Sequence, residues 1–159
     1  MSKYLFLCRH ADTAAAVAGQ PDFDRPLTLQ GLQDARTSAS WIQQTGLPVS
    51  AITCSAAVRT QATARIFGQV LHLPAAAIHP DKALYHASAD QLEAHIRLLP
   101  PAQQVAVFIG HNPAVSQLVG KLNSRPGQYV PTAGVNLYTL ATDDWQEIDW
   151  CELKWQANY

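Results

Sequence analysis

The sequence has few cysteines, almost no net charge and no long hydrophobic run. Its three cysteines, Cys8, Cys54 and Cys151, are far apart and form no C-x-x-C pair, which argues against a disulfide framework or a zinc site and indicates reduced, mostly buried thiols. A net charge of -1 gives no positive field that would gather nucleic acid or an anionic membrane. No run approaches the roughly 18 apolar residues of a membrane span, and charged residues come too early for a signal peptide. We therefore expect a soluble, cytoplasmic protein without nucleic-acid or membrane partners.

Motifs for cofactors are also missing. No glycine-rich loop follows a predicted strand, which argues against a nucleotide cofactor. His72, His79 and His95 lack the spacing of metal ligands, so we expect no metal and no cofactor. A chain of 159 residues, 48% of them hydrophobic, can bury one sizeable core. We expect residues 1–159 to form one domain and to act as a monomer.

Three apolar runs predict strands that are covered on both faces. Residues 4–8 and 105–109 are continuous runs of aliphatic and aromatic side chains. Residues 49–54 form a weaker run that contains the β-branched residues Ile52 and Thr53. Three internal strands imply a mainly parallel sheet, whose crossover connections need helices.

The first two predicted helices follow the first two strands. Apolar residues at helical spacing, a possible N-cap at Thr28 and a stop at Gly46 define the first helix. Residues 58–70 carry a second apolar stripe, with Pro74 beyond its end. These helices would cover the sheet between its strands.

Two more helices are predicted from their capping residues. Ser88, followed three residues later by Gln91, forms a capping box for a third helix that ends before Pro100. For the fourth helix, Asn112 is the expected cap and Pro113 suits the first helical position.

The C-terminal part has a different pattern. Residues 135–140 and 145–150 resemble strands, joined across residues 142–144. They predict an antiparallel hairpin at the sheet edge. The expected fold class is therefore α/β, a three-layer α/β/α sandwich with a mainly parallel sheet and an antiparallel edge hairpin.

Polar residues follow each predicted internal strand, where an open parallel sheet binds its ligands. Because the carboxyl ends of parallel strands lie at one edge of the sheet, we expect these side chains to converge on one crevice. They are Arg9 and His10 after the first strand, Arg59 after the second, and His111 and Asn112 after the third.

The chemistry of this crevice suits an anion. Arg59 lies near the start of its helix, where a cation is unfavourable unless an anion offsets it, and His111 precedes a helix start with free backbone N–H groups. The guanidinium groups of Arg9 and Arg59 match phosphate oxygens and can stabilise a transition state. His10 would then be free to attack, provided that it is neutral and that its other ring nitrogen donates to a backbone carbonyl.

Four segments resemble the motifs of the histidine phosphatase superfamily, in family order. RHAD at residues 9–12 looks like its R-H-G signature, and RPLTLQG at 25–31 resembles R-P-L-T-x-x-G. SAAVRTQATA at 55–64 is similar to S-P-x-x-R-A-x-Q-T-A, and GHNP at 110–113 is similar to the fourth motif. A match to one short motif is weak evidence for a family, but four matches in the family's order are specific.

This resemblance implies a phosphoglycerate mutase-like fold and a role for each matching residue. His10 would become phosphorylated, Arg9, Arg59 and His111 would form the phosphate pocket, and water would hydrolyse the phosphoenzyme. The short chain most resembles the compact SixA-type branch, which acts on phosphohistidine in signalling and phosphotransfer proteins. Short connections would leave the mouth open to a histidine on such a protein, which is the expected partner.

The sequence departs from the family pattern at two important places. Ala11 replaces the glycine after the nucleophile, which would cost about 1 kcal/mol or more if its φ were positive. Tyr85 and His86 stand where many relatives place an acidic glutamate, and we expect them to contact substrate. General acid catalysis is typically worth about a hundredfold to ten-thousandfold in rate. A phosphorylated imidazole whose ring is protonated leaves as neutral imidazole, so it needs this help less. Asp12 is a possible substitute acid or, equally, a helix cap or loop residue, and His86 is a less favoured substitute acid.

Several alternatives stay open. Arg25 can bind substrate at the rim or form a surface salt bridge with Asp22 or Asp24. Ser55 has no nucleophile elbow around it, so we interpret it as a turn or supporting hydroxyl. Besides a phosphohistidine phosphatase, the same residues would suit a small-molecule phosphomonoesterase or mutase, or a catalytically silent phosphate-binding protein.

Overall fold

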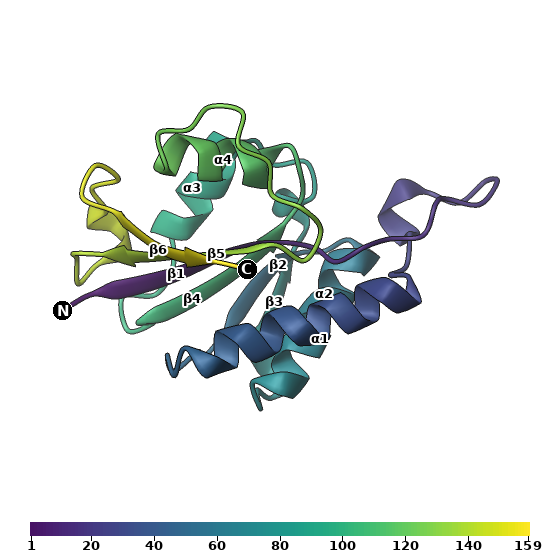
Figure 1. The fold of residues 1–159 in the computed structure, drawn as a ribbon, viewed down its shortest axis with the longest axis horizontal. Helices are drawn as coiled ribbons and strands as arrows, with labels where there is room; N and C mark the ends of the chain where they lie inside the picture. Colours follow the sequence, from purple (N-terminus) through teal and green to yellow (C-terminus); the bar gives the residue numbers. More distant parts are fainter.

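A six-stranded mixed sheet forms the centre of the computed structural model, which describes residues 1–159 (Figure 1). The strand order is β3-β2-β4-β1-β5-β6. The first four of these strands pair in parallel, whereas β5 pairs antiparallel with β1 and with β6. The strands are β1 Lys3–Arg9, β2 Ile52–Ser55, β3 Ile78–Asp81, β4 Val105–Gly110, β5 Val135–Leu140 and β6 Lys154–Asn158.

Two helices cover each face of the sheet (Figure 1). Helices α1 and α2 pack on one face, and α3 and α4 pack on the other, which confirms the three-layer sandwich. No helix is long and apolar enough to span a bilayer. The helices are α1 Leu29–Gln44, α2 Val58–Val70, α3 Ala89–Arg97 and α4 Ala114–Leu122.

Strand β1 explains why the first apolar run shows no alternation. Phe6 and Cys8 enter the core beneath α1 and α2, while Leu5 and Leu7 enter the core beneath α3 and α4. All four are fully buried. Burying one such large apolar side chain stabilises a fold by about 1.5 to 3 kcal/mol, so both faces of this strand hold the layers together.

The predicted caps of α1 and α3 are confirmed. Thr28 Oγ1 accepts from the Gly31 amide at 2.9 Å, and Ser88 and Gln91 form a complete capping box. Helix α4 begins one residue later than predicted, with Pro113 in the N-cap position. Asn112 Oδ1 nevertheless accepts from the Ser116 amide at 3.1 Å, so its side chain still satisfies a donor in the first turn.

The C-terminal hairpin was predicted at the correct edge but with the wrong second strand. Residues 145–147 form a 3-10 turn, and β5 pairs instead with the later strand β6. Asp144 caps this turn, and Trp145 and Ile148 both enter the core under α3 and α4. Two buried residues three positions apart suit a turn, because a strand would place them on opposite faces.

Two smaller differences concern the other edge. Strand β2 begins at Ile52 rather than at residue 49, and β3 was not predicted. Strand β3 has four residues, includes Pro80 and buries none of its side chains fully. Proline cannot donate a hydrogen bond to a sheet, so it is found in edge strands. Because β3 contains a proline and is partly exposed, it has no apolar run by which the sequence would predict it.

Candidate active site

His10 follows the end of β1 and is only 6% exposed. Its Nδ1 donates to the carbonyl of Ala11 at 2.7 Å, since a carbonyl oxygen can only accept. This bond places the ring proton on Nδ1 and leaves the lone pair of Nε2 free. The sequence analysis required such a bond for a nucleophilic histidine.

The backbone around His10 is fixed on both sides. Its amide donates to the Gly110 carbonyl at 3.1 Å, and its carbonyl accepts from the Ala133 amide at 3.0 Å. The next amide, that of Ala11, donates to Thr63 Oγ1 at 3.1 Å. Ala11 is not among the residues with positive φ, so alanine in place of the family glycine causes no backbone strain here.

His111 lies beside His10, at the end of β4. The two ring centroids are 5.2 Å apart, and His111 is 9% exposed. Its Nε2 and Ser55 Oγ are 2.8 Å apart, while its buried Nδ1 has no partner. Ser55 Oγ also accepts from the Ala57 amide at 3.3 Å, which agrees with its interpretation as a supporting hydroxyl.

Burial keeps both imidazoles neutral. It lowers the pKa of His10 from 6.5 to about 4; the bond to Ala11 opposes this shift, and the positive charges of Arg59, Arg9 and Arg25 add smaller contributions to it. It also lowers the pKa of His111 to about 3, with further lowering by His10 and Arg59. Neutral imidazoles near pH 7 can act as a nucleophile and as a hydrogen-bond donor.

Arg59 lies in the first turn of α2 and is 7% exposed. Both of its terminal nitrogens bind Asp22: Nη1 donates to the Asp22 carbonyl at 2.8 Å, and Nη2 donates to the carboxylate at 3.0 Å. An anion was predicted to offset this cation at the helix start. In the structure, the anion that meets Arg59 is a side chain of the β1–α1 connection.

Arg9 is held from the other side, by the α4–β5 connection. Its Nη1 donates to Tyr129 Oη at 2.7 Å and to the Val130 carbonyl at 3.2 Å, and the Tyr129 ring lies 5.5 Å from the guanidinium. The Nε of Arg9 is buried without a partner. A buried N–H without an acceptor is costly and suits a site that binds an anion.

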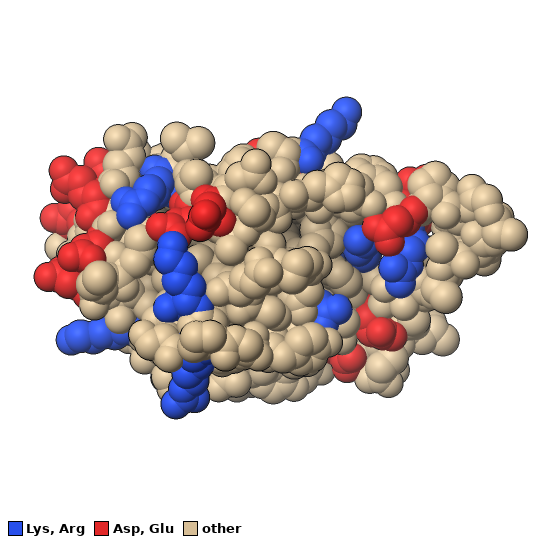
Figure 2. All heavy atoms as spheres, turned by 90° about the horizontal axis from the view of Figure 1, so that it is seen from above, with Lys and Arg blue, Asp and Glu red and all other residues tan.

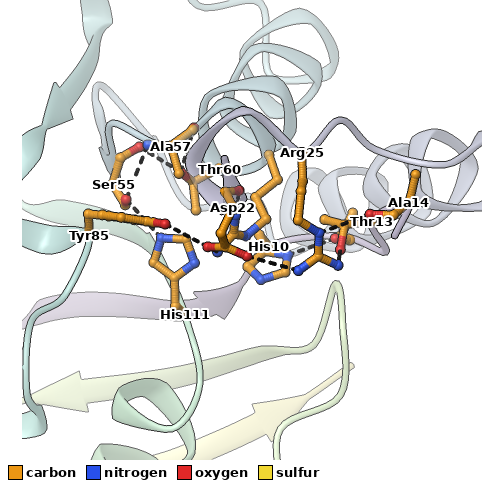
Figure 3. A network of polar contacts seen from close by, with 12 residues as sticks. His10, Thr13, Ala14, Asp22, Arg25, Ser55, Ala57, Thr60, Tyr85 and His111 are labelled. Atoms are coloured by element: carbon orange, nitrogen blue, oxygen red, sulfur yellow. Dashed lines mark hydrogen bonds and ion pairs between the residues drawn. The ribbon is translucent and has the colours of Figure 1, made fainter. Parts of the chain in front are cut away.

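Asp22 joins two arginines and a tyrosine (Figure 3). Its carboxylate also accepts from Arg25 Nη1 at 3.0 Å and from Tyr85 Oη at 2.6 Å. Arg25 is further fixed by the Ala14 carbonyl and the Thr13 hydroxyl. The structure therefore gives Arg25 the predicted ion pair with Asp22, and this pair lies beside His10 at the edge of the site (Figure 3).

We call the three buried residues His10, Arg59 and His111 the floor of the site. The more exposed side chains around it form the rim. Tyr85 connects the rim to the floor: the centroid of its ring lies 5.6 Å from that of His111 in the floor and 4.1 Å from that of His86 in the rim. The members of the rim are Asp22, Arg25, Tyr85, His86 and Tyr129.

Asp12 points toward the start of α1. Its carboxylate accepts from Thr28 Oγ1 at 2.7 Å, and its carbonyl accepts from the Thr28 amide at 3.0 Å. A Cβ on Gly31 would lie 2.2 Å from this carbonyl, so only glycine allows the helix to approach so closely. The RPLTLQG segment therefore anchors the chain that follows His10. An acid role for Asp12 stays a prediction.

Asn112 uses its side chain within the protein. Its Nδ2 donates to the Val130 carbonyl at 3.0 Å, and its Oδ1 accepts from both the amide and the hydroxyl of Ser116. These bonds support the start of α4 and leave one N–H of Nδ2 free to donate. A substrate contact of Asn112 stays a prediction.

Sequence analysis did not find two members of the site. Asp22 was considered only as a surface partner of Arg25, and Tyr129 was not considered at all. Asp22 lies in a 3-10 turn of the β1–α1 connection and Tyr129 in the α4–β5 connection, and each meets residues far away in the chain, so no local pattern marks them. Cys8 is fully buried, and burial raises its pKa, which keeps the thiol protonated. No group of three or more His, Cys, Asp or Glu side chains is arranged to hold a metal.

Comparison with protein families supports the motif reading. A model of the histidine phosphatase superfamily (branch 1) matches residues 5–98, which is more than half of the chain. The matched part includes His10, Arg25 and Arg59.

Individual relatives agree over nearly the whole length. Phosphohistidine phosphatase SixA of Escherichia coli (strain K12) is 28% identical over 159 residues, which cover 94% of this chain and 96% of that protein. A solved structure of the protein histidine phosphatase SixA complexed with tungstate has a TM-score of 0.80 and 23% identity, and the match covers 98% of this chain and 95% of that one. A structure assigned to SixA from Nakamurella multipartitia has a TM-score of 0.82 and 22% identity, covering 100% and 96%. The resemblance to SixA-type proteins and the expected phosphoglycerate mutase-like fold are thereby confirmed.

Proposed function

Because the chain belongs to the histidine phosphatase superfamily and is similar to phosphohistidine phosphatase SixA over nearly its whole length, we propose that it removes phosphate from a phosphohistidine of another protein. The reaction would pass through a covalent phosphohistidine on His10. The observation that carries this proposal is the bond between His10 Nδ1 and the Ala11 carbonyl, which leaves Nε2 as the nucleophile.

In the first step, Nε2 of His10 attacks phosphorus. A P–N bond forms to His10, and the P–N bond to the substrate imidazole breaks, with its electron pair remaining on the departing ring. In such transfers the attacking nitrogen, the phosphorus and the leaving nitrogen lie roughly in line. The nucleophile needs no deprotonation, because burial lowers the pKa of His10 to about 4.

The transferred group carries negative charge, which the surrounding donors would stabilise. Arg59 can offer the N–H groups that Asp22 does not bind, and the unpartnered Nε–H of Arg9 can donate to a phosphoryl oxygen. If Ser55 donates its hydroxyl proton to His111 Nε2, then the unpartnered Nδ1 of His111 carries a proton and becomes a third donor. In the second step, water attacks phosphorus, the bond to His10 breaks, and inorganic phosphate leaves.

A phosphorylated protein is the substrate that the surface favours. The rim is exposed: Tyr129 is 68% exposed, and the Asp22 side chain is 52% exposed. Figure 2 shows one group of acidic side chains at the end of the molecule where the β5–β6 connection lies in Figure 1, and acidic and basic side chains side by side at the opposite end, where the β1–α1 connection lies. A partner that docks over the rim therefore meets charges of both signs.

The proposal is tested by trapping the phosphoenzyme. Purified protein should remove label from a phosphorylated histidine phosphotransfer domain and should itself carry label on His10, labile in acid and stable in base. His10→Ala should do neither. Failure on a broad panel of phosphohistidine proteins, together with fast turnover of a sugar phosphate, would replace this substrate class with the small-molecule alternative.

A further inference from the structure

The carboxylate of Asp22 is rigidly held and yet open to the outside. Oδ2 accepts from Arg59 Nη2 at 3.0 Å and from Tyr85 Oη at 2.6 Å, and Oδ1 accepts from Arg25 Nη1 at 3.0 Å. Its side chain is 52% exposed, whereas that of Arg59 is 8% exposed. Asp22 therefore lies between the buried floor and the solvent, with one lone pair of Oδ1 left to accept another bond.

Asp22 is ionised at neutral pH and well below it. The hydrogen bond from Tyr85 contributes most to a pKa well below the usual 3.8, followed by the bonds from Arg25 and Arg59. A carboxylate with such a pKa cannot donate a proton to a leaving group, but it can accept one hydrogen bond more. Three titratable groups bind it, Arg25, Arg59 and Tyr85, and His111 is close enough for the charge of Asp22 to act on it. The other titratable groups of the site are Arg9, His10 and His86.

The direction of the reaction brings the leaving group toward Asp22. The nucleophile is at the floor, so a phosphoryl group on its way to His10 occupies the space in front of Nε2, in the plane of the ring. An in-line displacement places the leaving group on the opposite, outer side of phosphorus. That side is the level of the rim, where Asp22, Tyr85 and Arg25 lie (Figure 3).

We infer that Asp22 accepts a hydrogen bond from the protonated imidazole ring of the phosphohistidine substrate and makes this ring a better leaving group. The inference rests on the proposed function. The phosphorylated ring carries phosphorus on one nitrogen and a proton on the other. When the P–N bond breaks, its electron pair neutralises the ring, which departs as neutral imidazole with the same N–H still bound to Asp22. No proton has to be transferred to the breaking bond.

The same carboxylate would select against ordinary phosphate esters. A nearby negative charge raises the pKa of an imidazole, so a larger share of a phosphohistidine is protonated and reactive. An alkoxide leaving group develops negative charge instead, and Asp22 would repel it. Attraction for one leaving group and repulsion of the other together give specificity. The absence of the family's acidic glutamate at Tyr85 and His86 fits this division.

The test compares two substrates in Asp22→Asn. One is a phosphohistidine peptide, and the other is p-nitrophenyl phosphate, whose leaving group needs no proton. At pH 8 we expect kcat/KM for the peptide to fall about tenfold or more, as a pKa change of one unit in the ring implies, and its alkaline limb to move to lower pH. Turnover of p-nitrophenyl phosphate should not fall but rise by up to about threefold, because the variant no longer repels its anionic leaving group. Asp24→Asn, in the same 3-10 turn, is the matched control and should change neither.

Other results would overturn the inference in distinguishable ways. Equal losses on both substrates, with an unchanged pH profile, would show that Asp22 only positions Arg59. If the unaltered protein fails on the peptide but hydrolyses other phosphates, the proposed function itself is wrong. Asp22→Glu, which keeps the charge, should restore most peptide activity. Matching unfolding midpoints of all variants would exclude a loss of the fold as the cause.

Discussion

The floor and the rim of this site are built in different ways. The floor residues His10, Arg59 and His111 follow strand ends or begin a helix, and each is buried against the core. The rim residues lie on connections and are held by side-chain bonds between distant parts of the chain, such as Tyr85 to Asp22. The strands and helices therefore position the residues of phosphoryl transfer, and the connections position the residues that we expect to contact the leaving group. Mutations in the two regions should differ in size and in kind.

His10→Ala should have the largest effect. Loss of the nucleophile in other covalent enzymes lowers kcat by about a millionfold, and we expect a loss of at least about ten-thousandfold here. Single-turnover and steady-state assays with a phosphohistidine protein measure this. His95→Ala on α3 is the control, because that ring binds the Gln91 carbonyl away from the site. Substantial activity of the His10 variant would place the nucleophile elsewhere.

Two arginines that share Asp22 test the comparison directly. Arg59→Ala removes a buried donor from the floor, and we expect kcat/KM to fall about a hundredfold to a thousandfold, as when a preorganised oxyanion donor is lost. Arg25→Ala removes an arginine of the rim, and a loss of about tenfold or less is expected because partly exposed ion pairs contribute little. Similar losses for both variants would contradict the distinction between floor and rim.

The pH profile of kcat/KM tests whether burial lowers the pKa of His10. Since the pKa of His10 is lowered to about 4, kcat/KM should hold down to about pH 5, where an imidazole of pKa 6.5 would already be about 97% protonated. An acid limb near pH 6.5 would show that His10 is solvated. This acid limb of kcat/KM reports the protonation of the free enzyme.

Folding stability should depend on pH for the same reason. In the unfolded chain both floor histidines take up protons near pH 6.5, but in the folded protein their pKa values are about 4 and about 3. The unfolded state therefore binds more protons as pH falls through this range, so the free energy of unfolding decreases between about pH 7 and pH 4. Urea unfolding at several pH values measures the slope. His10→Asn should reduce it, while a slope of zero would contradict the lowered pKa values.

The sequence predicted the floor better than the rim, for a physical reason. Strand ends of a parallel sheet meet at one edge, so His10, Arg59 and His111 could be brought together from the order of apolar runs alone. The link from Asp22 to Arg59 spans 37 residues and depends on the path of the β1–α1 connection. No periodicity records such a contact.

The same difference between local and long-range contacts explains which elements of the fold were predicted correctly and which were not. The helix over residues 58–70 has a regular apolar stripe, and its predicted bounds agree with α2. The segment 145–150 has a strand-like composition, yet Trp145 Nε1 donates to the Gln103 carbonyl at 2.7 Å and holds the segment as a turn. Local pattern determines an element unless a tertiary contact offers a better arrangement.

A serine below the floor should have a moderate effect. Ser55→Ala removes the partner of His111 Nε2 and leaves a buried imidazole with two unpaired nitrogens. We expect kcat/KM to fall about tenfold, in the range of losses when the partner that orients a functional histidine is removed. Ser38→Ala, which removes another buried hydroxyl bond at 2.7 Å, is the matched control. Both should lower the free energy of unfolding by about 1 to 3 kcal/mol, but only Ser55→Ala should lower activity.

Tyr129→Phe should have the smallest effect and thereby sharpen the comparison at its weakest point. Arg9 belongs to the predicted phosphate pocket, yet its Nη1 is bound by the exposed Tyr129 hydroxyl and by the Val130 carbonyl. Phenylalanine keeps the ring over the guanidinium and removes only one bond, for which the second acceptor compensates. A net hydrogen bond is worth about 0.5 to 1.5 kcal/mol, so kcat/KM should fall by no more than about threefold. A larger fall, together with an unchanged unfolding midpoint, would mean that the rim positions Arg9 for catalysis, and the boundary between the two regions would then run through Arg9 itself.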